Sequence, residues 1–225
     1  KKGGLTLEKI KKAIDILNKY DIIIRNFFII GFPGETKEMI RKSLQFAADL
    51  NSDWTCIFIA TPIHGSDLHR MAHEEGYLNN GKNSNSKLEN THYLRAGIET
   101  EDFTAKELEE LQYDANLHIN FINNRNLINK RYDRAEVIYG DLIRLYPEHL
   151  FANYCYWQSL VGQNKLEDSK IIENRLRVLL KNSINIKYVK KYNLYNKKPF
   201  ADILSKREIE LTNVETLVTP KWQLM

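Results

Sequence analysis

The residues most suited to binding a ligand form a short turn between two apolar stretches. It reads Gly31-Phe32-Pro33-Gly34-Glu35-Thr36. The two glycines let the backbone leave a buried strand sharply and approach a ligand closely. Glu35 and Thr36 fall where a following helix offers free N–H groups. Taken alone, the same residues also describe a plain strand-to-helix turn with a capped helix, and both interpretations stay open at this point.

Two cysteines and three neighbouring histidines are the other candidates for chemistry. Cys56 and Cys155 lie far apart among apolar residues, without the spacing of a disulfide framework or a metal site, so we expect buried thiols. His69 and His73 are four residues apart, but the pattern lacks the glutamate and the third ligand of a zinc site, so no metal site is predicted. For His64 a proton-transfer role competes with a plain loop position, which is favoured.

Alternating helix and strand patterns surround the turn. Apolar residues recur at helical spacing over residues 6–20, and β-branched and aromatic residues then fill residues 22–30. In a parallel sheet this strand would be buried on both faces. A helix over residues 36–50 leads to a second apolar strand over residues 54–60. This order predicts right-handed crossovers and a parallel α/β sheet, with its ligand site beyond the carboxyl ends of the strands.

The second half of the chain has a helical pattern. Thr104 and Glu107 fit a capping box at the start of a long helix that extends through Ile122. Further helices are predicted over residues 132–145, 150–161 and 167–180.

The pattern changes from alternating helices and strands to helices alone near residues 98–103, and we interpret this change as a domain boundary. The polar stretch at residues 79–86 is typical of an exposed loop. We therefore expect an α/β domain at residues 1–103 and an all-α region at residues 104–225.

Composition limits the classes of protein that fit. The chain has 225 residues, of which 43% are hydrophobic and 28% charged, which excludes disorder throughout. No apolar stretch approaches the roughly 18 residues of a membrane helix, and no export signal is present, so we expect a cytoplasmic protein without a membrane span. The net charge of +4 lies entirely in residues 104–225. The chain begins at Lys1 without a methionine, and we interpret it as a fragment.

Residues 4–78 resemble the C-terminal half of the barrel of radical S-adenosylmethionine enzymes. In that family a strand ends in the turn found at residues 31–36, and the next strand ends in a Pro-x-x-Gly-Ser/Thr-x-Leu pattern, found here at residues 62–68. Residues 72–78 also resemble the family, and residues 97–104 are similar to the connector of its cobalamin-associated branch. The resemblance implies a partial (β/α) barrel similar to a TIM barrel.

The resemblance also implies what the turn binds. Residues that would contact or border S-adenosylmethionine are Ile29, Gly31, Phe32, Pro33, Gly34, Glu35, Ala60, Thr61 and Pro62, with Glu35 fixing the turn rather than performing chemistry. The family's three cysteines, spaced Cys-x-x-x-Cys-x-x-Cys, hold a 4Fe-4S cluster, and this chain lacks them. We therefore expect the cluster ligands upstream and the fragment alone to be inactive. The similarity of residues 97–104 to the cobalamin-associated branch implies cobalamin as a further cofactor. The implied reaction is reductive cleavage of S-adenosylmethionine for a radical-based modification, such as methylation, of an unknown small molecule or peptide.

Residues 132–147 resemble the second helix of a tetratricopeptide repeat. The small Ala135 lets helices approach, Tyr139 and Leu142 fill the groove, and Pro147 ends the unit. A second unit would use Tyr154, Trp157 and Leu160 on one helix and Ser169 on the next. Two interpretations stay open: a helical extension that caps the barrel, which is favoured, and a groove that binds a protein or peptide.

Lysines and tyrosines alternate near the end of the chain. They are Lys181, Lys187, Lys190, Lys191, Lys197 and Lys198 with Tyr188, Tyr192 and Tyr195. Such a pattern suits nucleic-acid binding, but a solvated basic face is favoured because the net excess of charge is small.

Two other functions compete with the proposed enzyme. A tRNA methylthiotransferase-like enzyme shares the turn at residues 31–36, but that group ends in a small β-rich domain rather than in helices. A non-catalytic helical adaptor would use a degenerate barrel as a support for its helices.

Overall fold

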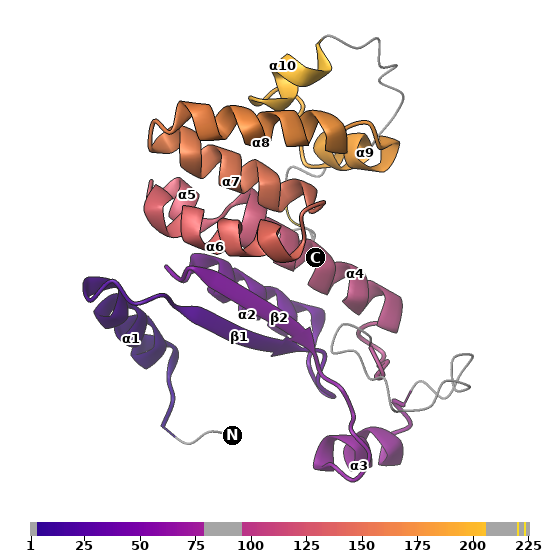
Figure 1. Cartoon of the computed structure of the whole chain (residues 1–225). Coiled ribbons are helices and arrows are strands. Elements are labelled where there is room, and N and C mark those ends of the chain that lie inside the picture. The colour runs from indigo at the N-terminus through magenta and orange to yellow at the C-terminus, as the bar shows by residue number, and fades with distance from the viewer. Residues whose placement is uncertain (1–3, 79–95, 206–219, 221–222, 224–225) are drawn as a thin grey trace. The chain divides into compact units, whose positions relative to one another are not determined.

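The computed structural model describes residues 4–78, 96–205, 220 and 223 (Figure 1). The chain divides into two compact units, Lys1–Ile119 with Pro220–Met225, and Asn120–Thr219. The loop predicted at residues 79–86 lies outside the described residues. No helix in the described ranges is long and apolar enough to cross a membrane.

The first unit alternates helices and strands, as the sequence predicts. Its elements are α1 (Leu7–Lys19), β1 (Arg25–Ile30), α2 (Lys37–Asp49), β2 (Trp54–Ile59), α3 (Asp67–Glu74) and α4 (Ala105–Leu117). Thr36 caps α2, because its side chain accepts a hydrogen bond from the Met39 N–H. Thr104 and Glu107 form the predicted capping box of α4. The predicted long helix changes at His118–Ile122 into a π-helical turn, which is a departure from the expected uninterrupted helix.

The two strands are parallel, which confirms the predicted α/β class. Their register runs from Arg25 opposite Trp54 to Ile30 opposite Ile59. A barrel beyond these two strands stays a prediction.

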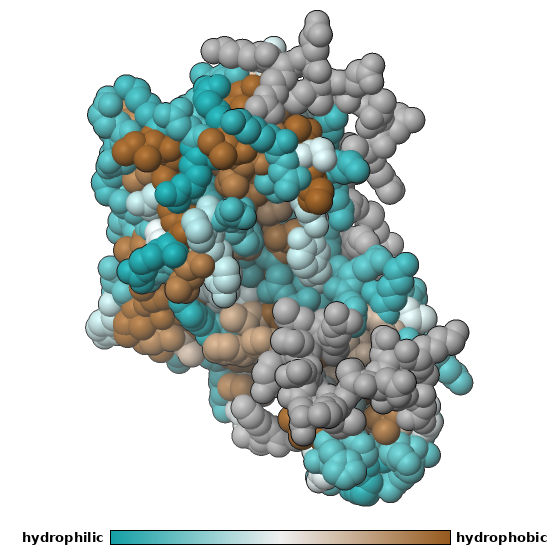
Figure 2. Space-filling view, turned by 45° about the vertical axis from the view of Figure 1, so that its right-hand side comes forward, coloured by the Kyte–Doolittle hydropathy of each residue, from teal (hydrophilic) through white to brown (hydrophobic). Residues whose placement is uncertain are grey.

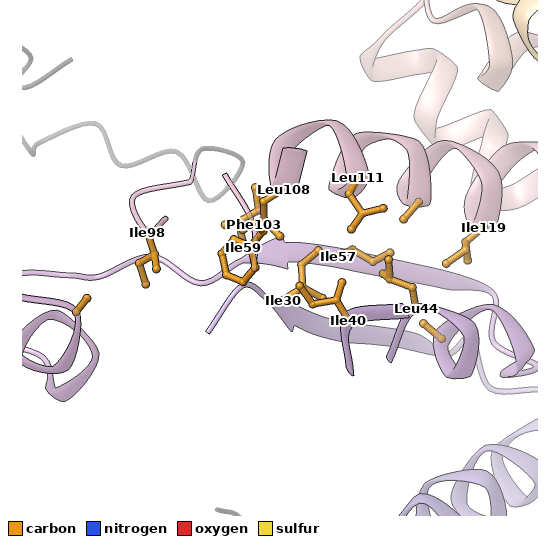
Figure 3. Close-up of a cluster of buried hydrophobic side chains, with 13 residues drawn as sticks. Ile30, Ile40, Leu44, Ile57, Ile59, Ile98, Phe103, Leu108, Leu111 and Ile119 are labelled. Atoms are coloured by element: carbon orange, nitrogen blue, oxygen red, sulfur yellow. The ribbon is translucent and has the colours of Figure 1, made fainter. Parts of the chain in front are cut away.

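One face of the sheet carries the core of this unit. Ile30, Ile57 and Ile59 are buried on it under α2 and α4. Figure 3 shows Leu108 and Leu111 pointing from α4 toward this face. Both helices cover the same side, since a right-handed crossover places α2 there and α4 packs beside it.

The other face is open, so the expectation that β1 is buried on both faces is wrong for the described residues. Phe27 is 67% and Ile29 50% exposed. Successive strand side chains point to opposite faces, and no described element covers the face that Phe27 and Ile29 occupy. Phe27 and Ile29 are therefore apolar side chains that the described part of the chain leaves exposed.

The outer edge of β2 is closed by two amide side chains of α4. Asn116 Oδ1 accepts from the Ile57 N–H at 3.4 Å, and Asn116 Nδ2 donates to the Ile57 carbonyl at 3.1 Å. Gln112 Nε2 donates to the same carbonyl at 2.7 Å. At Ile57 these contacts replace the hydrogen bonds that a further strand would make, so α4 blocks strand pairing at this point of the edge.

We expect replacement of both amides by Leu, Gln112→Leu with Asn116→Leu, to lower the free energy of unfolding by about 2 kcal/mol or more. Each buried backbone group left unpaired costs about 1–3 kcal/mol. Urea unfolding measures this loss. The control is Gln45→Leu, which removes an amide whose partners are the exposed side chains of Asp49 and Gln223. An equal loss in both proteins would contradict the edge-closing role.

The second unit is helical, as predicted. Its helices are α5 (Arg125–Ile128), α6 (Tyr132–Leu145), α7 (Leu150–Gly162), α8 (Leu166–Leu179), α9 (Ser183–Lys191) and α10 (Phe200–Leu204). Helix α7 packs between α6 and α8 (Figure 1). A Cβ on Gly162 would lie 2.5 Å from the Tyr132 ring, so this glycine allows α6 and α7 to pack closely at that point. Ala135 and Tyr139 are fully buried, in agreement with their predicted packing roles.

Aromatic side chains fill the space around α7. Phe151 packs edge-on against Tyr188 and Tyr192, and the Tyr154 ring lies 4.7 Å from that of Phe200. Helix α7 is therefore buried on more sides than the helices before and after it. Its similarity to a tetratricopeptide unit stays a prediction.

A neutral imidazole caps α7. His149 Nδ1 accepts a hydrogen bond from the Ala152 N–H at 3.1 Å, and the ring stacks on Phe121 with centroids 4.8 Å apart. Burial lowers the pKa of His149 from its ordinary value of 6.5. Protonation would add a charge to a mostly buried ring and remove the acceptor of the cap.

The helical unit should therefore lose stability as the pH falls below about 6.5, because the unfolded chain then binds a proton at residue 149 that the folded chain excludes. Urea unfolding at pH 7.5 and pH 5.5 measures the difference. His149→Asn keeps an acceptor for the cap but does not titrate, so its loss between the two pH values should be smaller. An identical loss in both proteins would assign the pH effect to other groups.

Candidate functional site

The carboxyl ends of β1 and β2 meet at one edge of the sheet because the strands are parallel. The Ala60 N–H donates to the Ile30 carbonyl at 2.8 Å and joins the two strand ends. This edge brings together the two predicted stretches, residues 29–35 and residues 60–62.

Glu35 closes the turn after β1. Its Oε2 accepts from the Gly31 N–H at 2.6 Å and from the Phe32 N–H at 3.0 Å, and its own N–H donates to the Phe32 carbonyl. The carboxylate thus fixes the turn, as the sequence predicts. The same contacts occupy the N–H groups of residues 31 and 32, so contacts between a ligand and the turn fall to other atoms.

Gly31 is required for packing as well as for the turn. Its φ is +87°, and a Cβ built there would lie 2.3 Å from Leu108 Cδ2 of α4. The sequence suggests a close approach to a ligand at this glycine, whereas the structure fills the space with Leu108. Gly34 also has a positive φ, +80°, but no atom lies within 4 Å of its Cβ position.

The open sheet face extends the site below the turn. Ile29 lies on it beside β2, where its register partner is Phe58, and the rings of Phe27 and Phe58 stack with centroids 6.1 Å apart. Cys56 lies on the same face and is half-buried, so the expected full burial is wrong for this thiol, although partial burial still raises its pKa. The sequence analysis missed Phe27 and Phe58 as site residues. Both lie in continuous apolar runs, which give no signal for the face that each side chain occupies.

The turn after β2 is mostly structural. Ala60 and Pro62 are buried, and Pro62 lies about 3.1 Å from the position that a Cβ on Gly97 would occupy. Thr61 is half-buried, and its hydroxyl donates to the Ile59 carbonyl at 3.2 Å. Of these three residues, Thr61 is the one with a partly accessible side chain.

The three histidines cluster around α3. The rings of His64 and His69 lie 4.8 Å apart, and those of His69 and His73 lie 6.4 Å apart. Among the residues that the structure describes, no three His, Cys, Asp or Glu side chains are arranged to hold a metal ion. The histidine rings contact one another without forming such a site.

Comparison with known proteins finds similarity over less than a third of the chain. An uncharacterized methyltransferase of Pyrococcus horikoshii is 35% identical over 31% of this chain and 15% of its own length. A tRNA-2-methylthio-N(6)-dimethylallyladenosine synthase of Buchnera aphidicola subsp. Cinara cedri is 42% identical over 26% of this chain and 14% of its own. A ribosomal protein uS12 methylthiotransferase of Dechloromonas aromatica is 38% identical over 29% and 14%.

These partial similarities support the radical S-adenosylmethionine superfamily. The chain spans about one seventh of the length of these curated relatives. No protein-family model and no solved structure matches it. The names of the relatives indicate a family of enzymes, and two of the three concern methylthio groups.

The close contact at Gly31 gives a direct test of the turn. We expect Gly31→Ala to lower the free energy of unfolding by about 2–4 kcal/mol, because it adds both backbone strain and a clash with Leu108. Gly34→Ala, the matched control, should cost about 1 kcal/mol from strain alone. Urea unfolding of the two variants separates the effects, and equal losses would show that the space next to Leu108 does not matter.

Proposed function

We propose that this chain is the C-terminal part of the barrel of a radical S-adenosylmethionine enzyme, followed by a helical region similar to tetratricopeptide repeats. In the proposal, the whole protein cleaves S-adenosylmethionine reductively at a 4Fe-4S cluster and uses the product to modify, by methylation, an unreactive carbon of its substrate. Cobalamin is the proposed carrier of the methyl group.

The observation that carries the proposal is the asymmetry of the sheet. Helices cover one face and close the β2 edge, whereas the face with Phe27 and Ile29 is uncovered. In a (β/α) barrel the helices lie outside and the opposite strand faces line the interior. Apolar residues reach the surface at several places in the described part of the chain (Figure 2). Those on the sheet are where the rest of a barrel would pack.

The backbone of β1 supports the same arrangement. The Trp54 N–H donates to the Ile24 carbonyl, and the Ala60 N–H donates to the Ile30 carbonyl. Because a parallel ladder alternates, the backbone groups of Arg25, Phe27 and Ile29 point to the other edge. That edge is suited to a further parallel strand, and the proposed barrel supplies one.

Among the proposed cofactors, the residues present fit S-adenosylmethionine and do not fit the cluster. Cys56 and Cys155 belong to different units and are the two cysteines of the sequence, so this chain cannot supply the three thiolates of the cluster. The apolar wall of Ile29 and Phe58, next to the strand ends, suits the adenine ring of S-adenosylmethionine.

When bound, the cluster and S-adenosylmethionine supply the bond cleavage and the radical chemistry. The residues of this chain bind and orient. Ile29 would exclude water beside the adenine, Glu35 would hold the turn rigid, and the strand ends at Ala60–Pro62 would border the same space. None of these proposed roles requires a side chain of this chain to transfer a proton.

The test begins with the coding sequence upstream of Lys1. An in-frame Cys-x-x-x-Cys-x-x-Cys motif is expected, and after anaerobic reconstitution the whole protein should release 5′-deoxyadenosine. A start codon just upstream without the motif would overturn the enzyme proposal and favour the helical adaptor. Because relatives are named for methylthio transfer, mass analysis of the modified substrate distinguishes a methyl from a methylthio product.

In the reconstituted protein, Ile29→Asp should lower 5′-deoxyadenosine release by about tenfold or more, because an unpaired carboxylate beside the adenine costs more than about 1.4 kcal/mol. Ile16→Asp on α1 is the control, since Ile16 is 45% exposed and Ile29 50%. Equal release by the two variants would contradict the placement of Ile29 in the cofactor site.

A further inference from the structure

Charge is segregated within the helical unit. Residues 174–201 contain eight basic residues and no acidic one, whereas residues 132–173 contain seven acidic and four basic residues. The +4 of the whole chain therefore underestimates the local charge. The segregated segment includes the end of α8, the whole of α9 and the loop that precedes α10.

Three lysines of this segment share one face of α9. Lys187, Lys190 and Lys191 are spaced i, i+3 and i+4, which places them side by side on a helix surface, about 5–6 Å apart at their Cβ atoms. Val189 and Tyr192 are buried on the opposite side. The packing of α9 thus fixes which way the lysine row faces: Lys187 is exposed, and Lys190 and Lys191 are half-buried.

Within the described residues, the three lysines of α9 lack the ion pairs that several other lysines form. Lys37, Lys42, Lys165 and Lys170 each form an ion pair with a glutamate. Within the described residues, the three α9 lysines form none, and Lys191 lies instead over the Tyr192 ring at 5.5 Å. Their positive charge is therefore not neutralised by neighbouring carboxylates of the described chain.

The two tyrosines Tyr188 and Tyr192 are used by the core, and the third tyrosine of the segment, Tyr195, is half-buried beyond α9. Tyr188 and Tyr192 stack on each other and both pack edge-on against Phe151. A nucleic acid on this face would find cations for its phosphates and no aromatic platform for its bases. The expected binding is thus salt-dependent and independent of sequence.

We infer that the lysine row of α9 binds the phosphodiester backbone of a single-stranded nucleic acid. Lysines that neutralise phosphates release the counterions condensed on the nucleic acid, and this release drives such binding. This inference goes beyond the solvated basic face expected from the sequence, and it does not rest on the proposed enzyme function.

The test uses the whole chain and a fluorescein-labelled 20-nucleotide oligo(U), with anisotropy measured between 50 and 200 mM KCl. The variant K187Q/K190Q/K191Q should bind about tenfold more weakly at 100 mM KCl. Its plot of log affinity against log salt should be less steep by about 2, which is what three lost phosphate contacts predict for a single strand. The control, K12Q/K19Q/K106Q, removes three exposed lysines of the first unit and should change affinity less than about twofold.

Three results would overturn the inference: no binding by the unchanged chain at 50 mM KCl, equal weakening in both variants, or equal competition by a poly-glutamate peptide of matched charge. The last result would favour an acidic protein partner. A DNA strand of the same length tests whether the 2′-hydroxyl contributes, with equal affinity assigning the binding to the phosphates alone. Circular dichroism of both variants shows whether the helices are retained.

Discussion

The packing of α4 on β2 is the contact on which the α/β unit depends. A two-stranded sheet buries too little to be stable alone, and the crossover helix α2 supplies part of its cover. Helix α4 returns to the sheet from a distant part of the chain and adds three kinds of contact: Leu108 fills the space beside Gly31, Leu111 extends the core, and Asn116 pairs with the backbone of Ile57. One helix therefore fixes the turn, the core and the edge together.

The sequence predicts best what depends on neighbours along the chain. The caps at Thr36 and Thr104, the strand at residues 54–59 and the helix at residues 132–145 follow from local spacing, and all are present. The turn-fixing role of Glu35 is local as well, since its carboxylate reaches back only four residues.

The features that sequence reasoning missed depend on distant parts of the chain. The exposure of Phe27 and Ile29 depends on whether a second layer covers that face, which no pattern in the strand itself records. The reason for Gly31 lies in Leu108, and that for Gly162 lies in the ring of Tyr132. The π-helical turn at His118–Ile122 follows a helix whose apolar spacing continues without interruption, so periodicity alone could not place it.

The aromatic residues of the helical unit pack inward, and this packing determines which residues remain at its surface. Phe121, Phe151 and Tyr192 gather around α7, and the capping imidazole of His149 joins them by stacking. Because the rings pack inward, most charged residues of the neighbouring helices are left outside, and Arg134 of α6 is a buried exception. Packing and surface charge in this unit are thus two results of one amphipathic pattern.

The contacts of α4 with the outer edge of β2 determine on which side the sheet could gain a further strand. A strand pairs with a neighbour through its free backbone groups, and at Ile57 these groups are already bound by α4. Any duplication or recombination that lengthened this sheet during evolution would have had to insert its strand–helix units before β1. Modules that follow α4 in the sequence, such as the helical unit, pair with neither β1 nor β2 in the described residues and could instead be exchanged without altering the pairing of these strands.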